Sequence, residues 1–228
     1  MNRCVILQPS FAPWLGVFKL IAEADVFVHY DDVQFDKNGW RNRNRIEERG
    51  ELAWITIPVR GSTSRQLNQT EINWSGGWES KLRKRLAANW KRRPFGTETL
   101  GLVESALDPR PTMLTDLTIP LTESVSKVLG VTPKQGFVRA SEVGIGGSRN
   151  GRLIALVEAL NCSVYRSGPS ARAYIDESMF RAHGIAVEWE TYGFPRPLAP
   201  AFPNASVLDH LSFHWSAASA LIMATPYS

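Results

Sequence analysis

The sequence predicts an α/β protein with a mixed, mostly parallel sheet flanked by helices, in a single domain over residues 1–228. Apolar runs of strand length alternate with amphipathic helical segments near the N-terminus, and the same alternation returns in the last third of the chain. No low-complexity tract or linker separates these parts. The composition, with 43% hydrophobic and 21% charged residues, is that of an ordinary globular protein.

The first predicted unit is strand, helix, strand. Residues 3–7 form a short apolar strand, and residues 15–24 form a helix with Leu15, Phe18 and Ile21 on one face. Residues 26–28 form the second strand, which ends at Asp31 and Asp32. Two strands joined by a helix usually run parallel, so this unit favours a parallel sheet.

The middle and the end of the chain supply the remaining elements. We predict strands at 54–59 and 71–74 and helices at 78–90, 97–106 and 115–129, where Pro120 either kinks the last helix or marks its start. The last third predicts a helix at 153–160, a strand at 163–165, a helix at 176–183 and a strand at 185–189. A proline-rich loop precedes a final helix at 206–223, and stiff loops of this kind often line a site.

Charge and cysteine content narrow the class of protein. The net charge is +4, no apolar stretch approaches the length of a membrane span, and Cys4 and Cys162 are too far apart to form a disulfide framework. We therefore expect a cytoplasmic protein with no membrane partner. A basic cluster at 81–93 is suited to binding an anionic small molecule, a carrier or nucleic acid; the alternative is a solvated helix face. If the cluster binds a phosphate or a carrier, we expect the contacts to be Lys84, Arg85 and Arg92.

The segment 8–16 follows the first strand. Ligands of open α/β sheets bind at the carboxyl ends of strands, so Gln8, which offers both a donor and an acceptor, is a candidate site residue. Pro9 and Pro13 stiffen the loop. The alternative is a rigid connection in which Gln8 caps backbone groups.

The segment 31–46 is the most polar part of the chain. Adjacent carboxylates at a strand end can divide roles, with one of Asp31 and Asp32 facing the crevice as a base or metal ligand. If residues 41–45 are extended, Arg41, Arg43 and Arg45 share one side and suit a phosphate or carboxylate. The alternative is internal pairing of these arginines with the nearby carboxylates, which are Asp31, Asp32 and Asp36.

Three further motifs are weaker. Ser167 and Gly168 again follow a strand, where backbone N–H groups hold anions, although a plain turn explains them nearly as well. The glycine-rich run at 144–149 lacks the lysine of a phosphate loop and reads as a loop with Ser148 capping a helix. His210 and His214 share a helix face, but Leu211 stands where a zinc protease has glutamate, so we expect no metal; no motif names a cofactor.

These motifs together resemble the WbqC-like family over nearly the whole chain. The resemblance rests on segments 8–16, 25–28, 31–35, 40–46 and 54–59, on Tyr165, Ser167, Gly168 and Tyr174, and on 184–185 and 206–209. Three positions depart from the family pattern. Leu7 replaces a histidine, Pro197 and Ala199 replace a tyrosine and a glutamine, and His214 replaces an asparagine.

The resemblance implies a role in bacterial surface-glycan or small-molecule biosynthesis. We expect a tailoring transferase that moves an acyl or aminoacyl group to a small acceptor, with Asp31 or Asp32 as base and Gln8 orienting the acceptor. A carrier-bound or tRNA-bound donor is compatible with this expectation. The alternatives are a non-catalytic protein that binds an anionic ligand, and a nucleic-acid binder that uses the basic helix. The expected substrate contacts are Pro9, Trp14, Gln34, Trp40, Arg43, Asn44, Arg45, Ser167, Gly168, Tyr174 and Asp209.

Overall fold

The computed structural model describes residues 1–61, 65–192, 202 and 204–223. Its centre is a five-stranded sheet in the order β7-β2-β1-β8-β9, and every neighbouring pair runs parallel. The predicted α/β class with a mostly parallel sheet is confirmed, whereas the assignment of residues 1–228 to one domain stays a prediction. The strands are β1 (Arg3–Leu7), β2 (Val26–His29), β7 (Phe137–Arg139), β8 (Val164–Ser167) and β9 (Ala186–Trp189).

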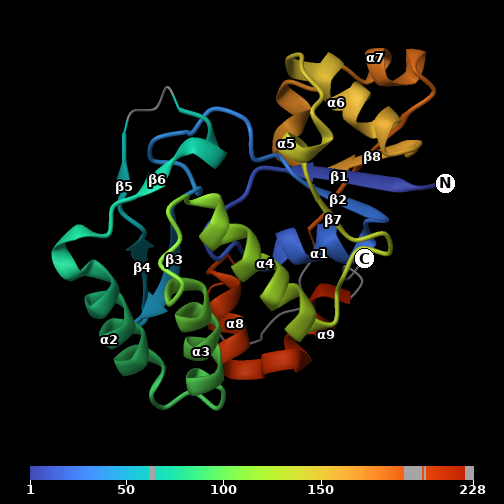
Figure 1. Cartoon of the computed structure of the whole chain (residues 1–228). Helices are drawn as coiled ribbons and strands as arrows, with labels where there is room; N and C mark the ends of the chain where they lie inside the picture. The colour runs from blue at the N-terminus through green and yellow to red at the C-terminus, as the bar shows by residue number, and fades with distance from the viewer. Residues whose placement is uncertain (62–64, 193–201, 203, 224–228) are drawn as a thin grey trace.

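Helices cover both faces of the sheet (Figure 1). Successive strand side chains point to opposite faces, so Val5 and Phe27 pack into one hydrophobic cluster while Ile6 and Val28 pack into the other. The first cluster lies under α1 (Leu15–Glu23), α4 (Thr115–Leu129), α8 (Val207–His214) and α9 (Ser219–Met223). The second lies under α5 (Ala140–Val143), α6 (Arg149–Ala159) and α7 (Glu177–Ala182).

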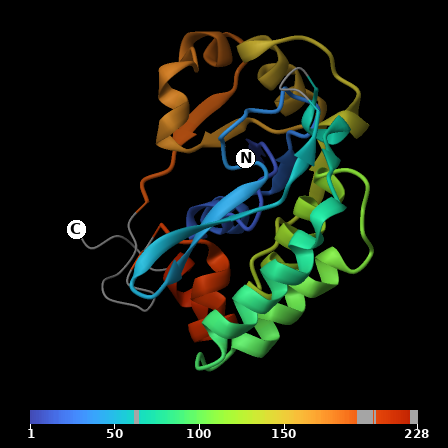
Figure 2. The same ribbon diagram turned by 90° about the vertical axis from the view of Figure 1, so that its left-hand side faces the viewer.

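The long segment between β2 and β7 contains α4 and adds two antiparallel strand pairs and the helices α2 and α3 beside the sheet (Figure 2). The predicted strand at 54–59 divides at Pro58, which has no N–H to donate to a ladder. The segment 41–45, considered only as possibly extended, overlaps a strand of its own at residues 43–48. The elements are β3 (Arg43–Glu48), β4 (Glu51–Thr56), β5 (Val59–Arg60), β6 (Glu71–Ile72), α2 (Trp78–Trp90) and α3 (Gly96–Leu107).

The predicted final helix is two helices. Trp215 has a φ of 47°, which a continuous helix cannot contain, so α8 ends there and α9 begins after a short turn. Pro120, by contrast, lies inside α4. Pro195, Pro197, Ala199, Pro200 and Pro203 lie outside the described residues. Short 3-10 turns occupy Leu67–Gln69, Ser75–Gly77, Pro169–Ala173 and Trp215–Ala218.

The strand order determines where a site can form. The chain leaves β1 through α1 on one face of the sheet and leaves β8 towards α7 on the other face. Loops that leave neighbouring strands in opposite directions open a crevice at the carboxyl ends of those strands. In the described part of the chain, no helix has the length and apolarity needed to cross a bilayer.

Candidate functional site

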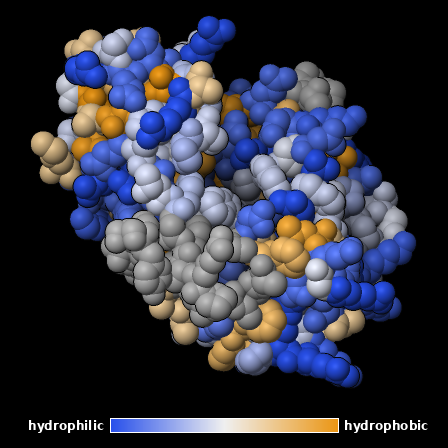
Figure 3. Space-filling view, turned by 180° about the vertical axis from the view of Figure 1, so that it is seen from behind, coloured by the Kyte–Doolittle hydropathy of each residue, from blue (hydrophilic) through white to orange (hydrophobic). Residues whose placement is uncertain are grey.

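A cavity of about 840 Å³ lies at the carboxyl ends of β1, β2 and β8. The loop after β1 contributes Gln8 and Ser10, the end of β2 contributes Tyr30, and β8 with the turn after it contributes Ser167 and Ser170. Figure 3 shows the surface hollowed between the part that carries α6 and α7 and the part that carries the β3–β4 hairpin. The crevice expected from the strand order is therefore present and large enough for a small molecule.

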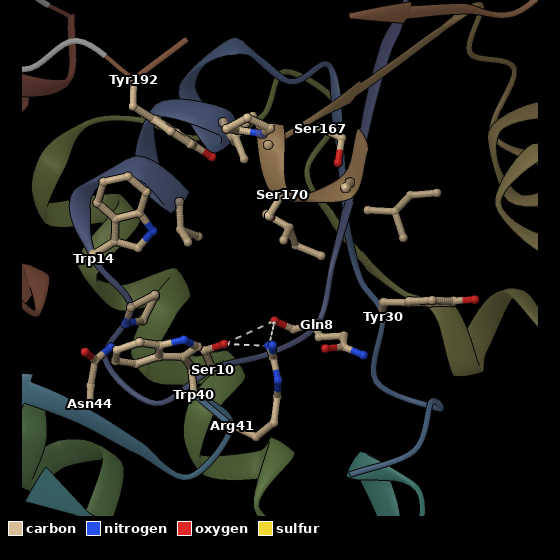
Figure 4. A pocket seen from close by; sticks show the side chains of 18 of the residues that line it. Gln8, Ser10, Trp14, Tyr30, Trp40, Arg41, Asn44, Ser167, Ser170 and Tyr192 are labelled. Carbon is tan, nitrogen blue, oxygen red and sulfur yellow. Dashed lines mark hydrogen bonds between the residues drawn. The ribbon is translucent and has the colours of Figure 1, made fainter. Parts of the chain in front are cut away.

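The cavity has an aromatic side and a polar side (Figure 4). Trp14 and Tyr192 stand on the aromatic side with ring centroids 4.6 Å apart at 65°, and Trp40 lies below them. A Cβ added at Gly168 would lie 2.9 Å from the Tyr192 hydroxyl oxygen, so a larger residue there would require the Tyr192 side chain to move. Burial raises the pKa of Tyr192, which keeps its hydroxyl protonated and able to donate.

Arg41 fixes the loop after β1. Its Nη1 donates to the Gln8 carbonyl oxygen at 3.0 Å and to the Ser10 hydroxyl at 2.7 Å, and its Nε donates to Asp36 at 2.9 Å. Burial lowers the pKa of Arg41, and the ion pair with Asp36 opposes that shift. The Gln8 side-chain amide has no hydrogen-bond partner among the described residues, so it remains available to a ligand.

Asn44 and Arg45 reach the cavity from β3. Asn44 is buried and its Nδ2 donates to the carbonyl oxygens of Phe11 and Ala12, which ties the hairpin to the loop after β1. Arg45 lines the cavity, and its Nε is buried without a hydrogen-bond partner among the described residues. The hairpin therefore brings a cation to the cavity wall and leaves part of it unsatisfied.

The acidic pair is not part of the cavity lining, which corrects the expectation that one carboxylate faces the crevice. Asp31 is fully buried and accepts hydrogen bonds from the backbone N–H of Ser141 at 3.0 Å and from its hydroxyl at 2.7 Å. Asp32 forms an ion pair with Arg152. The N-terminus of α5 and a nearby arginine thus hold both carboxylates, which is their internal-pairing alternative.

Asp209 and Gln34 also lie outside the cavity lining. Asp209 is buried and accepts hydrogen bonds from the Glu47 backbone N–H and Arg93 Nη1, both at 2.6 Å, and from Trp90 Nε1 at 3.1 Å. These hydrogen bonds join α8 to β3 and α2, and burial raises the pKa of Asp209 to about 6. Gln34 is exposed and its strand bridge is to Gln66.

The basic cluster at 81–93, which spans α2 and the residues just after it, divides into paired and exposed cations. Arg85 pairs with Glu48 at 2.8 Å, Arg83 with Asp108 at 2.6 Å, and neither projects into solvent alone. Lys84 and Arg92 are exposed. Arg85 therefore belongs to the internally paired set, whereas Lys84, within α2, and Arg92, just after it, remain predicted carrier or phosphate contacts.

Eight of the predicted site residues line the cavity together. Two others do not line it: Pro9 is buried, and Arg43 stacks on the Trp54 ring. Tyr30 and Tyr192 were missed, although each follows a predicted strand end within a few residues. No cluster of three or more His, Cys, Asp or Glu side chains suited to a metal occurs in the described ranges. The eight are Gln8, Trp14, Trp40, Asn44, Arg45, Ser167, Gly168 and Tyr174.

Comparison with known proteins gives two matches in one family. Residues 8–220 match the WbqC-like protein family. A relative from Mycobacterium tuberculosis (strain ATCC 25618 / H37Rv), described as "Uncharacterized protein Rv1507c", is 32% identical over 218 residues, which cover 92% of this chain and 93% of the relative. No solved structure matches the chain. Because the match includes the loop after β1, the β3 segment and β8, the chain belongs to the WbqC-like protein family.

Proposed function

We propose that this chain is a cytoplasmic tailoring enzyme of a bacterial surface-glycan or small-molecule pathway. It transfers an acyl or aminoacyl group to a small acceptor bound in the cavity at the carboxyl ends of β1 and β8. The observation that supports this most is the charge of the wall. Arg41 and Arg45 line the cavity, no Asp or Glu does so among the described residues, and Arg45, unlike Arg41 with Asp36, has no carboxylate partner in the described ranges. Such a wall favours a substrate that carries a phosphate or carboxylate.

The side chains of the wall restrict the chemistry. The described lining contains no His, Cys, Asp, Glu or Lys, so it offers neither a strong base nor a strong nucleophile. An amine needs less help, since it is nucleophilic once deprotonated in solution. Its nitrogen attacks the acyl carbon of a thioester or ester, the C–N bond forms, the C–S or C–O bond breaks, and the amine proton leaves with the thiol or alcohol. An amine acceptor and an activated donor therefore fit this cavity better than a hydroxyl acceptor.

The protein's contribution in this proposal is alignment and hydrogen bonding. Holding two reactants in register supplies effective molarities on the order of 10⁵ M or more. In this proposal the Gln8 side-chain amide, which has no hydrogen-bond partner among the described residues, donates to the carbonyl oxygen of the donor. The Ser167 hydroxyl lies across the cavity from the aromatic side. Arg41 holds the Gln8 loop through the Gln8 carbonyl oxygen and so acts as a positioning residue.

A direct test uses purified protein, acyl thioesters and small anionic amines, with product detected by mass spectrometry. Gln8→Ala should lower kcat about 10²-fold, the usual loss when one donor to a developing oxyanion is removed. Gln34→Ala is the matched control, because this glutamine is exposed and outside the cavity lining, and it should leave turnover unchanged. Equal turnover of wild type and Gln8→Ala would remove Gln8 from the reaction.

The second candidate is a non-catalytic protein that binds an anionic ligand. The same lack of ionisable side chains in the described lining favours it, because binding requires no base. Calorimetry with phosphorylated or carboxylated amines then gives a binding isotherm, while mass spectrometry of the same mixtures with donors gives no product. The nucleic-acid alternative is less favoured, because Arg83, Arg85 and Arg93 of the basic cluster are paired within the protein.

A further inference from the structure

The β3–β4 hairpin carries a set of stacked side chains at the edge of the cavity, the Trp–Arg platform (Trp40, Arg43, Arg45 and Trp54). The two indole rings lie 5.3 Å apart at 34°, and they are 41% and 42% exposed. The Arg43 guanidinium lies 4.2 Å from the Trp54 centroid, and the Arg45 guanidinium lies 5.4 and 5.6 Å from the two rings. Large exposed aromatic side chains interleaved with arginine are a common surface for binding flat anionic ligands.

The two arginines of the platform differ from the other arginines of the described chain. Each of the others that is buried or half-buried forms an ion pair with a carboxylate, whereas Arg43 and Arg45 form none. Arg43 donates only to the carbonyl oxygens of Asn38 and Gly39, and the buried Nε of Arg45 has no partner in the described ranges. Partly desolvated cations without a counter-charge are costly, and a bound anion would offset that cost.

The platform and the cavity are continuous. Trp40 and Arg45 belong to both, because they line the cavity and also contact Trp54. Figure 4 shows the Trp40 ring edge-on below the cavity, so that a flat face of the ring is turned towards it. The strand register, with Arg45 opposite Trp54, holds the cation and the ring side by side. One ligand can therefore stack on the platform while the rest of it enters the cavity.

We propose that the Trp–Arg platform binds the nucleotide portion of a substrate. The base stacks on Trp40 and Trp54, the phosphates contact Arg43 and Arg45, and the reacting group extends towards Gln8. Base stacking on aromatic side chains and bidentate contacts from arginine to phosphate are the two elements of such recognition. A sugar without phosphate would also stack on tryptophan, but it would leave both guanidiniums uncompensated. This inference rests on the proposed function, since it names the class of substrate that this site takes.

The first experiment divides the ligand into its parts. ADP is the probe in calorimetry with the full chain, and adenosine and ribose 5-phosphate supply the base and the phosphate separately. We expect ADP to bind at least tenfold more tightly than either part, because stacking and phosphate contacts act together. Coenzyme A and the trinucleotide CCA then distinguish a thioester carrier from a tRNA 3′ end as the source of the nucleotide. No binding of ADP, coenzyme A or CCA overturns the proposal, and so does adenosine binding as tightly as ADP.

Variants then locate the binding. Trp54→Ala should weaken ADP binding about tenfold, and Arg43→Ala should do the same and reduce the dependence of affinity on salt. Arg110→Ala is the matched control, because this arginine also lies over an indole ring, 4.7 Å from the Trp74 centroid, but away from the cavity lining. Thermal melting verifies that each variant is folded. If Arg43→Ala does not fold, Arg45→Lys replaces it, because lysine keeps the charge and loses the bidentate guanidinium. Equal ADP affinity for Arg110→Ala and Trp54→Ala contradicts the assignment.

The outcomes separate this inference from the proposed function. ADP binding that depends on Trp54, together with no acyl transfer to any amine, keeps the platform and removes the transferase. Acyl transfer that depends on Gln8, together with no nucleotide binding, keeps the transferase and removes the platform.

Discussion

Two pairs of tryptophans in the segment between β2 and β7 look alike in sequence and differ in what they do. Trp74 and Trp78 stack 5.2 Å apart at 27°, and their indole N–H groups donate to the carbonyl oxygens of Pro111 at 2.9 Å and Asn73 at 2.7 Å. Arg110 lies over Trp74 and pairs with Glu79 at 3.1 Å. Every polar group of this pair is thus used within the protein, which is the pattern of a structural cluster.

The Trp–Arg platform has the same residue types, but its indole N–H groups and its positive charges are not satisfied by other residues of the described chain. The indole N–H groups of Trp40 and Trp54 have no hydrogen-bond partner among the described residues, and Arg43 and Arg45 have no carboxylate. Residue type alone therefore does not separate a binding surface from a structural contact. What separates them is whether the chain satisfies its own donors and charges.

Asp209→Ala should have the largest effect on stability, because it removes the carboxylate from a paired arginine. Arg93 would keep Glu47 but lose its buried partner, and breaking a buried pair typically costs about 3–5 kcal/mol. At about 2–4 °C per kcal/mol for a chain of this size, thermal melting should fall by roughly 6–20 °C. Arg43→Ala, which breaks no ion pair, is the comparison and should change the free energy of unfolding by less than about 1 kcal/mol. Similar losses of stability in both variants would contradict the distinction between arginines that form an ion pair and arginines that form none.

The two tryptophan pairs should respond differently to truncation. Trp74→Ala removes packing against the main hydrophobic cluster and a hydrogen bond, and we expect a loss of about 3 kcal/mol. Trp54→Ala removes an exposed ring and should cost less than about 1 kcal/mol. Chemical denaturation with a single cooperative transition measures both. A larger loss in Trp54→Ala would mean that the platform holds the hairpin together rather than binding a ligand.

The titration of Asp209 gives a third, pH-dependent effect. Burial raises its folded-state pKa to about 6, above the value of about 3.9 for an unfolded aspartate, so the folded state holds the proton more tightly. The unfolded state therefore releases that proton first, and stability from this group falls as pH rises from about 4 to 6. Two pKa units correspond to roughly 3 kcal/mol as an upper figure. Denaturation at pH 4, 5, 6 and 7 should show this fall in wild type and a flatter profile in Asp209→Asn.

Parts of this site could be predicted from the sequence because they depend on chain order. A polar loop directly after an apolar strand must lie at the carboxyl end of that strand, which places Gln8 and Ser167 at the same edge of the sheet. The helix at 78–90 also follows from its own pattern, since Leu82, Leu86 and Trp90 are buried along one face.

The use of each carboxylate could not be predicted, because it depends on partners far along the chain. Asp31 is held by Ser141 and Asp32 by Arg152, and no local pattern links residues separated by more than 100 positions. The approach of the Tyr192 hydroxyl to Gly168 is also long-range, whereas the break at Trp215 is a local φ of 47° that no residue pattern indicates. Sequence reasoning found the polar segments, and long-range pairing decided which of their side chains face the cavity.

The smallest expected effect is at two exposed cations, Lys84 on α2 and Arg92 just after its end. Lys84 and Arg92 are exposed and unpaired within the described residues, as an electrostatic contact with an acidic carrier protein requires, whereas Arg85 is paired with Glu48. The double variant Lys84→Glu, Arg92→Glu should lower kcat/KM for a carrier-bound thioester several-fold at low salt and leave a free thioester unchanged. The difference should shrink as salt rises, because exposed charges are screened over about 8 Å at physiological ionic strength. Equal loss with both donors would place the effect in the fold, and no loss with either would mean that Lys84 and Arg92 are only solvated.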